Sequence, residues 1–181
     1  DYVWLIDSDE VYRNEDLEKV ENLIIKDPTI TQINLIPDNF WKGFDYIFVS
    51  QRFFERENHY RRIFSYKKGA KFISHRPPTL IWPDKNKTTE QMKLIDGNSA
   101  RDMGIRMFHY SYIYPNQVEQ KINLYKNYGW DKNWNIDFDN WYERFFLRWN
   151  EENRAELEKK FPVWTGDRNS ATQKQSFDHP E

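Results

Sequence analysis

The 181-residue chain is long enough for a sizeable core, and we expect a single domain. Its 27 Lys and Arg residues are interspersed with 29 Asp and Glu residues, a balance that argues against nucleic acid as a partner. The absence of cysteine excludes disulfides and thiolate metal sites and fits a reducing compartment, so we expect a cytoplasmic location. No run of about 18 apolar residues is present, so we expect no membrane span.

The first 50 residues predict a strand, a helix and two further strands. Residues 2–6 form a continuous apolar run, which is typical of a strand covered on both faces in an α/β sheet. With Asn14 as the N-cap, helical spacing of apolar residues predicts a helix that ends near Asp27. The β-branched segment 29–36 and the apolar segment 46–49 are the next two predicted strands.

The middle of the sequence predicts a hairpin, a long loop and a strand. Residues 62–66 and 70–73 flank Lys67-Lys68-Gly69, which is a turn-like sequence, and we expect them to pair with each other. Residues 76–101 contain three prolines and little periodicity, so a long loop is expected there. Residues 105–112 predict another strand.

The last third of the sequence is predominantly helical in pattern. Pro115 marks a helix start, and the helix is expected to end at Gly129. The pattern of residues 138–161 predicts a second helix with Trp141, Phe145 and Trp149 facing inward. Residues 165–181 are expected to form a disordered tail. Strands and helices are mixed along the chain, which indicates an α/β protein without the regular alternation of a complete doubly wound domain.

Asp7 and Asp9 are the first candidates for chemistry, because they stand two residues apart at the end of the first predicted strand. On an extended backbone both carboxylates point the same way, and ligands of open α/β sheets bind at such strand ends. Carboxylate oxygens suit a hard divalent cation such as Mg²⁺ or Mn²⁺. The residues alone leave open the alternative that both acids cap a turn or the following helix.

Basic and imidazole side chains supply the other candidates. His109 lies in a strand-like segment, where a neutral imidazole could complete a metal site or serve as a structural residue. Arg62 and Arg76 stand beside the predicted hairpin, and their guanidinium groups could face phosphate or simply line a solvated surface.

Three blocks follow one another along the chain, and they are the apolar strand with Asp7-Ser8-Asp9-Glu10, the segment 60–72, and Phe108-His109-Tyr110 before a long amphipathic helix. Together they resemble family 2 glycosyltransferases of the GT-A fold, in particular enzymes similar to lipopolysaccharide core glycosyltransferases. The resemblance covers most of residues 1–130. It implies that residues 1–164 are the carboxy-terminal part of a GT-A domain, a Rossmann-like fold with a mixed sheet, which begins at the Asp-x-Asp strand and ends in helices.

The resemblance also implies an activity and a set of roles. A sugar would pass from a nucleotide-sugar donor, a UDP-sugar above all, to a hydroxyl of a glycan or lipid-linked acceptor, with inversion and with Mn²⁺ or Mg²⁺. Asp9 would ligate the metal, Asp7 would contact the metal or the donor, and His109 would reach the metal or the diphosphate. Arg62 would contribute to donor binding. The family often places His-Glu where this chain has His75-Arg76, so His75 is the nearest candidate for the catalytic base.

Asp1 has no preceding Met and the first strand begins at once, so we expect a fragment. The resemblance implies that the amino-terminal nucleotide-binding half is missing, and that the fragment alone would bind nucleotide poorly or fold incompletely. Two other functions fit parts of the sequence. In a haloacid-dehalogenase-type phosphatase Asp7 would attack phosphorus and Asp9 would act as acid and base. In a carbohydrate-binding module the many Trp and Tyr residues would hold a glycan, and binding would survive Asp9→Ala.

Overall fold

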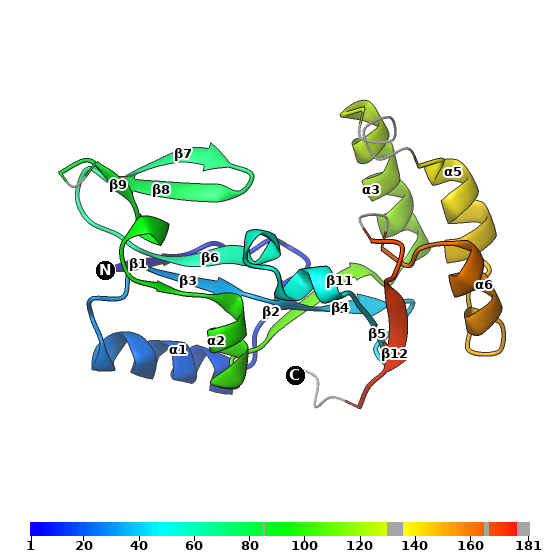
Figure 1. The fold of residues 1–181 in the computed structure, drawn as a ribbon, viewed down its shortest axis with the longest axis horizontal. Helices are drawn as coiled ribbons and strands as arrows, with labels where there is room; N and C mark the ends of the chain where they lie inside the picture. The colour runs from blue at the N-terminus through cyan, green and yellow to red at the C-terminus, as the bar shows by residue number, and fades with distance from the viewer. Residues whose placement is uncertain (85, 130–135, 165–166, 177–181) are drawn as a thin grey trace. The chain divides into compact units, whose positions relative to one another are not determined.

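The computed structural model describes residues 1–84, 86–129, 136–164 and 167–176 (Figure 1). The chain folds into two compact units. Unit 1 contains Asp1–Pro37 and Phe53–Phe108, and unit 2 contains Asp38–Arg52 and the described residues from His109 onward. Both units combine strands with helices, which confirms the expected α/β class. Within the described ranges, no helix is long and apolar enough to cross a membrane.

A four-stranded mixed sheet forms the centre of unit 1. Its strands follow the order β1 (Tyr2–Trp4), β6 (Tyr60–Ser65), β3 (Gln32–Leu35) and β10 (Leu94–Ile95). Strand β6 is antiparallel to both neighbours, whereas β10 is parallel to β3. Strand β1 is an edge strand of this sheet, and its residues are only half-buried. The prediction of a strand covered on both faces was therefore wrong.

Two helices, α1 (Asn14–Lys26) and α2 (Gly97–Asp102), lie on one side of this sheet (Figure 1). Helix α1 begins at Asn14 with Arg13 as its N-cap, one residue earlier than predicted. The buried core between helices and sheet consists of Val20, Ile30, Ile33, Leu35, Ile63, Ala100, Ile105 and Met107. Val20 and Ala100 come from the two helices and Ile33, Leu35 and Ile63 from the two inner strands, while the other three stand in the segments beside them, so their common burial fixes the sheet against the helices.

A three-stranded sheet completes unit 1, and it contains β7 (Lys71–His75), β8 (Pro78–Trp82) and β9 (Lys87–Thr88). Strand β7 pairs with β8 and not with β6, so the predicted hairpin around Lys67-Lys68-Gly69 was wrong. The predicted loop over 76–101 was wrong as well, because β8, β9, the 3₁₀ turn Thr89–Gln91, β10 and α2 lie there. These strands pair across short connections and bury few residues, and therefore lack a clear apolar period.

Unit 2 is built on strands in the order β12 (Ala171–Lys174), β5 (Tyr46–Val49), β4 (Pro37–Trp41) and β11 (Met107–Tyr112). Pro37 of β4 and the first two residues of β11 belong to unit 1. Its helices are α3 (Pro115–Asn127), α5 (Phe138–Trp141), the π-helical turn Tyr142–Phe146 and α6 (Arg154–Lys160). The short 3₁₀ turns Gln51–Phe54 and Arg56–Asn58 follow β5, and the short strand β2 (Glu10–Val11) precedes α1.

The core of unit 2 is aromatic. Trp41 is fully buried, and its ring contacts Trp141, Phe145 and Trp149 at centroid distances of 6.0, 5.5 and 6.1 Å. The inward orientation predicted for these three residues is therefore confirmed. The helix predicted over 138–161 is interrupted, because the Asn150 side chain accepts hydrogen bonds from the backbone N–H groups of the following turn.

The carboxy-terminal segment is partly ordered. Ala171–Lys174 pair antiparallel with β5, and the Thr172 N–H donates to the Glu158 carboxylate at 3.1 Å. The expectation of a disordered tail was therefore wrong for this strand, while residues 165–166 and 177–181 lie outside the described residues. Strand β5 supplies the hydrogen-bond partners for the backbone N–H and C=O groups of this segment, whose side chains are mostly polar.

Candidate functional site

The candidate site in unit 1 begins at a tight turn after β1. The Glu10 N–H donates to the Asp7 carbonyl oxygen at 3.0 Å, which closes a turn over Asp7-Ser8-Asp9-Glu10. Asp and Ser favour such turns because their short polar side chains bond nearby backbone groups. Asp7 and Asp9 therefore lie in a turn and do not share one face of an extended strand as predicted.

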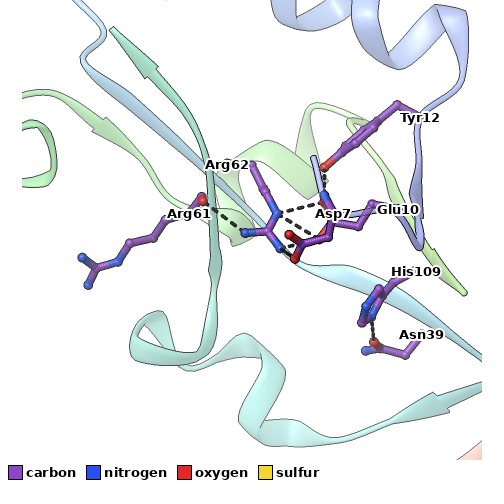
Figure 2. Close-up of polar contacts among 7 residues, drawn as sticks. All are labelled: Asp7, Glu10, Tyr12, Asn39, Arg61, Arg62 and His109. Atoms are coloured by element: carbon purple, nitrogen blue, oxygen red, sulfur yellow. Dashed lines mark hydrogen bonds and ion pairs between the residues drawn. The ribbon is translucent and has the colours of Figure 1, made fainter. Parts of the chain in front are cut away.

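The β1–β6 pairing brings this turn to Arg62. Trp4 is paired with Ile63, and one step further the Leu5 N–H donates to the Arg62 carbonyl oxygen at 2.8 Å. Neighbouring side chains of β6 point to opposite faces, so Arg61 extends away toward Thr79 while Arg62 points to the turn (Figure 2). The register of two antiparallel strands thus decides which arginine meets the acidic residues.

A buried ion pair between Arg62 and Glu10 is the centre of the site (Figure 2). The Glu10 side chain is completely buried and that of Arg62 is 8% exposed. Arg62 Nε lies 2.9 Å from both carboxylate oxygens of Glu10, and Nη2 donates to Oε1 as well. The Tyr12 hydroxyl donates to Oε2 at 3.2 Å, and the Asp7 N–H approaches the same oxygen at 3.4 Å. The buried carboxylate is thus surrounded by donors, as burial of a charge requires.

The electrostatics of the cluster follow from this burial. Burial raises the pKa of Tyr12 well above its ordinary value, and the negative charge of Glu10 raises it further, so the phenol is neutral near pH 7. Burial acts to lower the pKa of Arg62, but hydrogen bonds to Glu10 and the charges of Glu10 and Asp7 outweigh it, and the net shift is upward. The guanidinium is therefore a permanent cation beside two carboxylates.

Asp7 is the second carboxylate on this cation. Arg62 Nη2 donates to Asp7 Oδ2 at 2.8 Å, and the Asp7 side chain is 69% exposed. Two residues that stand 55 positions apart and were both predicted to contact the donor are thus in direct contact. Glu10 and Tyr12 had not been assigned a role, although Glu10 belongs to the Asp-x-Asp-Glu block, because neither burial nor pairing over 52 positions is visible in the sequence.

The predicted metal ligands are distributed between the units. Asp7 and Asp9 lie in unit 1, where Asp9 is half-buried at the third position of the turn. His109 lies in unit 2 and is buried, and its Nδ1 is 2.6 Å from Asn39 Oδ1 (Figure 2). In the part of the chain that the structure describes, no group of three or more Asp, Glu or His side chains is arranged to hold a metal ion.

The donor atoms of the turn nevertheless suit a hard cation. Mg²⁺ in phosphate-binding sites commonly takes only one or two protein carboxylates and fills its other positions with water and phosphate oxygens. Asp7 and Asp9 could supply such ligands, although an N–H of Arg62 already occupies Oδ2 of Asp7. A cation bound at Oδ2 of Asp7 would therefore replace the guanidinium there.

The predicted base is located in a different sheet from Arg62. His75 is the last residue of β7, is exposed, and is paired with Pro78 across the turn to β8. An exposed imidazole is accessible to an acceptor hydroxyl, but none of the hydrogen bonds of the described residues connects it to Asp7 or Arg62.

The chemistry of the site is thus defined by a buried, oriented guanidinium with one buried and one exposed carboxylate. Such a group matches planar or tetrahedral oxyanions, since its N–H donors form a fixed fork. Comparison with models of protein families, with curated proteins and with solved structures finds no match to this chain.

Proposed function

We propose that this chain is part of a GT-A glycosyltransferase that transfers a sugar from a nucleotide-sugar donor, a UDP-sugar above all, to an acceptor hydroxyl. The observation that carries the proposal is the contact between Asp7 and Arg62 at 2.8 Å. Both residues were predicted to bind the donor, on separate motifs, and nothing in the sequence required them to meet. Their contact supports a common site for the donor diphosphate.

The chemistry of such a transfer fits the groups at this site. Breaking the bond between sugar and phosphate leaves negative charge on the nucleoside diphosphate, and fixed positive charge beside it lowers the barrier. Arg62 supplies one such charge, held in place by Glu10. A divalent cation on Asp7 and Asp9 would add further neutralisation of the leaving group when bound.

The acceptor hydroxyl must lose its proton during the transfer, and His75 is the residue that we propose as the base. Imidazole accepts a proton near neutral pH, and His75 is exposed at the end of β7. Glu10 is unsuitable for this task because its oxygens are buried and already accept hydrogen bonds from Arg62 and Tyr12.

The alternative functions receive less support from the geometry. A phosphatase with Asp7 as nucleophile needs a carboxylate free to attack, in a series of parallel strands, whereas β1 pairs antiparallel with β6 and Asp7 contacts Arg62. Trp41, Trp141 and Trp149 are buried and cannot hold a glycan, so a carbohydrate-binding module would have to use exposed rings such as Tyr114 and Tyr128.

The test is turnover of nucleotide-sugars by the protein at its natural full length. A panel of UDP-, GDP- and ADP-sugars, with p-nitrophenyl phosphate beside them, is assayed with Mn²⁺, with Mg²⁺ and with a chelator. We expect release of nucleoside diphosphate from one donor only in the presence of a divalent cation, and its loss in Asp9→Asn. Turnover that persists in chelator contradicts the proposal, and cleavage of p-nitrophenyl phosphate alone would favour the phosphatase.

A further inference from the structure

The guanidinium of Arg62 presents two edges, and they differ in how they are occupied. The Nε–Nη2 edge faces Glu10, which accepts from both nitrogens. The outer end carries the remaining N–H groups of Nη1 and Nη2, where Asp7 accepts from Nη2 at 2.8 Å and the Arg61 carbonyl lies 3.4 Å from Nη1. This outer end is the edge that takes an oxyanion in a two-pronged contact.

The two carboxylates on Arg62 also differ in how easily they can leave. The Glu10 side chain is completely buried, so moving it away would leave the buried guanidinium of Arg62 without its main countercharge and would break the hydrogen bond from Tyr12. Asp7 is 69% exposed and belongs to a turn that is closed by backbone atoms, so its side chain can rotate into water without breaking that turn. Glu10 is therefore a fixed partner of Arg62, and Asp7 is an exchangeable one.

The charges explain why such an exchange matters for an anionic ligand. One guanidinium faces two carboxylates, so the cluster in its present state carries more negative than positive charge. A phosphate that approached Arg62 would meet the Asp7 carboxylate both as a competitor for Nη2 and as a like charge. Departure of Asp7 removes both obstacles at once.

We propose that Asp7 occupies the phosphate position on Arg62 in the unliganded chain, and that a phosphate or diphosphate ligand displaces it while Glu10 holds the guanidinium in place. The inference rests on the proposed function, because it concerns the contact between Arg62 and the donor diphosphate. It adds that Glu10 is a positioning residue and that Asp7 restrains binding until it is released. The released carboxylate becomes available to a cation that accompanies the phosphate.

The experiment measures binding of inorganic pyrophosphate to the full chain in chelator, by titration calorimetry. Because an exposed ion pair contributes little, Asp7→Asn is expected to bind pyrophosphate about two- to fivefold more tightly than the unchanged chain. The matched control is Asp139→Asn, which removes an equally exposed carboxylate, 69%, from its ion pair with Lys126. That control changes the net charge by the same amount and is expected to leave pyrophosphate affinity unchanged.

A second measurement observes the exchange directly. In ¹³C spectra, saturating pyrophosphate is expected to shift the carboxyl resonance of Asp7, identified by its loss in Asp7→Asn, and to leave that of Glu10 in place. Equal or weaker binding by Asp7→Asn, an equal gain in Asp139→Asn, or an unmoved Asp7 resonance would each overturn the exchange. Pyrophosphate needs no sugar, so the exchange could hold in a protein that transfers none, and the proposed function could hold without the exchange.

Discussion

The buried ion pair between Glu10 and Arg62 allows a sharp prediction about stability, tested with Glu10→Gln. Glutamine keeps the size of the side chain and one acceptor oxygen but removes the charge. Arg62, 8% exposed, would then retain only the exposed Asp7 as a countercharge. We therefore expect a large loss of stability from a substitution that changes only one functional group.

The magnitude follows from burial. Removing one partner of a buried ion pair costs about 3–5 kcal/mol, because the other charge stays buried, here with only the exposed Asp7 carboxylate to offset it. In a chain of this length that loss corresponds to a fall in Tm of about 6–20 °C. Asp7→Asn removes a carboxylate from the same guanidinium, but at an exposed site, and should cost about 0.2–1 kcal/mol.

Urea denaturation followed by far-ultraviolet circular dichroism compares the two variants with the unchanged chain. A double-mutant cycle with Glu10→Gln and Arg62→Met isolates the coupling between the two side chains, and the double variant is expected to recover much of the loss because no unpaired charge remains buried. If Glu10→Gln and Asp7→Asn cost the same, or if the double variant is no more stable than Glu10→Gln, the distinction between a fixed and an exchangeable partner fails.

Two further predictions concern the contact between α2 and the segment before β6. A Cβ at Gly97 would lie 2.8 Å from Ile36 Cγ1 and 2.9 Å from His59 Cγ, which is too close for either contact. Gly97→Ala is therefore expected to lower the free energy of unfolding by about 1–3 kcal/mol, although alanine has the higher helix propensity. An unchanged midpoint in urea denaturation contradicts this. Burial lowers the pKa of His59 below its ordinary value of 6.5. Between the folded-state pKa and pH 6.5, the imidazole is therefore mainly neutral in the folded chain and mainly protonated in the unfolded chain. The stabilisation is complete above pH 6.5 and declines as the pH falls toward the folded-state pKa, and an NMR titration midpoint of His59 at or above 6.5 would refute it.

Local patterns predicted much of the secondary structure. Helix α3 begins at Pro115 as expected, because proline fits the first helical position, and its buried residues Val118 and Ile122 keep the helical period. Strands β5 and β11 were recognised from apolar runs whose residues are buried in the fold. These elements were predictable because their signals lie within a few neighbouring residues.

Pairing between distant segments was not predictable in the same way. Strands β6 and β7 are separated by a turn that suggests a hairpin, yet β6 pairs with β1 and β3 while β7 pairs with β8. The choice of partner depends on which apolar faces can be buried together, and a single sequence shows each strand's own alternation but not its neighbour. The same limit explains why polar Ala171–Lys174 were not recognised as a strand beside β5.

By itself, the sequence determined the residue types of the candidate site, since Asp7, Asp9 and Arg62 stand in motifs that favour phosphate and cation chemistry. Only the tertiary structure decided how they are used. The register of β1 against β6 turned Arg62 toward the acidic turn and buried Glu10 against it. A charged side chain is exposed or buried according to what packs over it, and for Glu10 and Arg62 that environment comes from segments about 50 residues away in the chain.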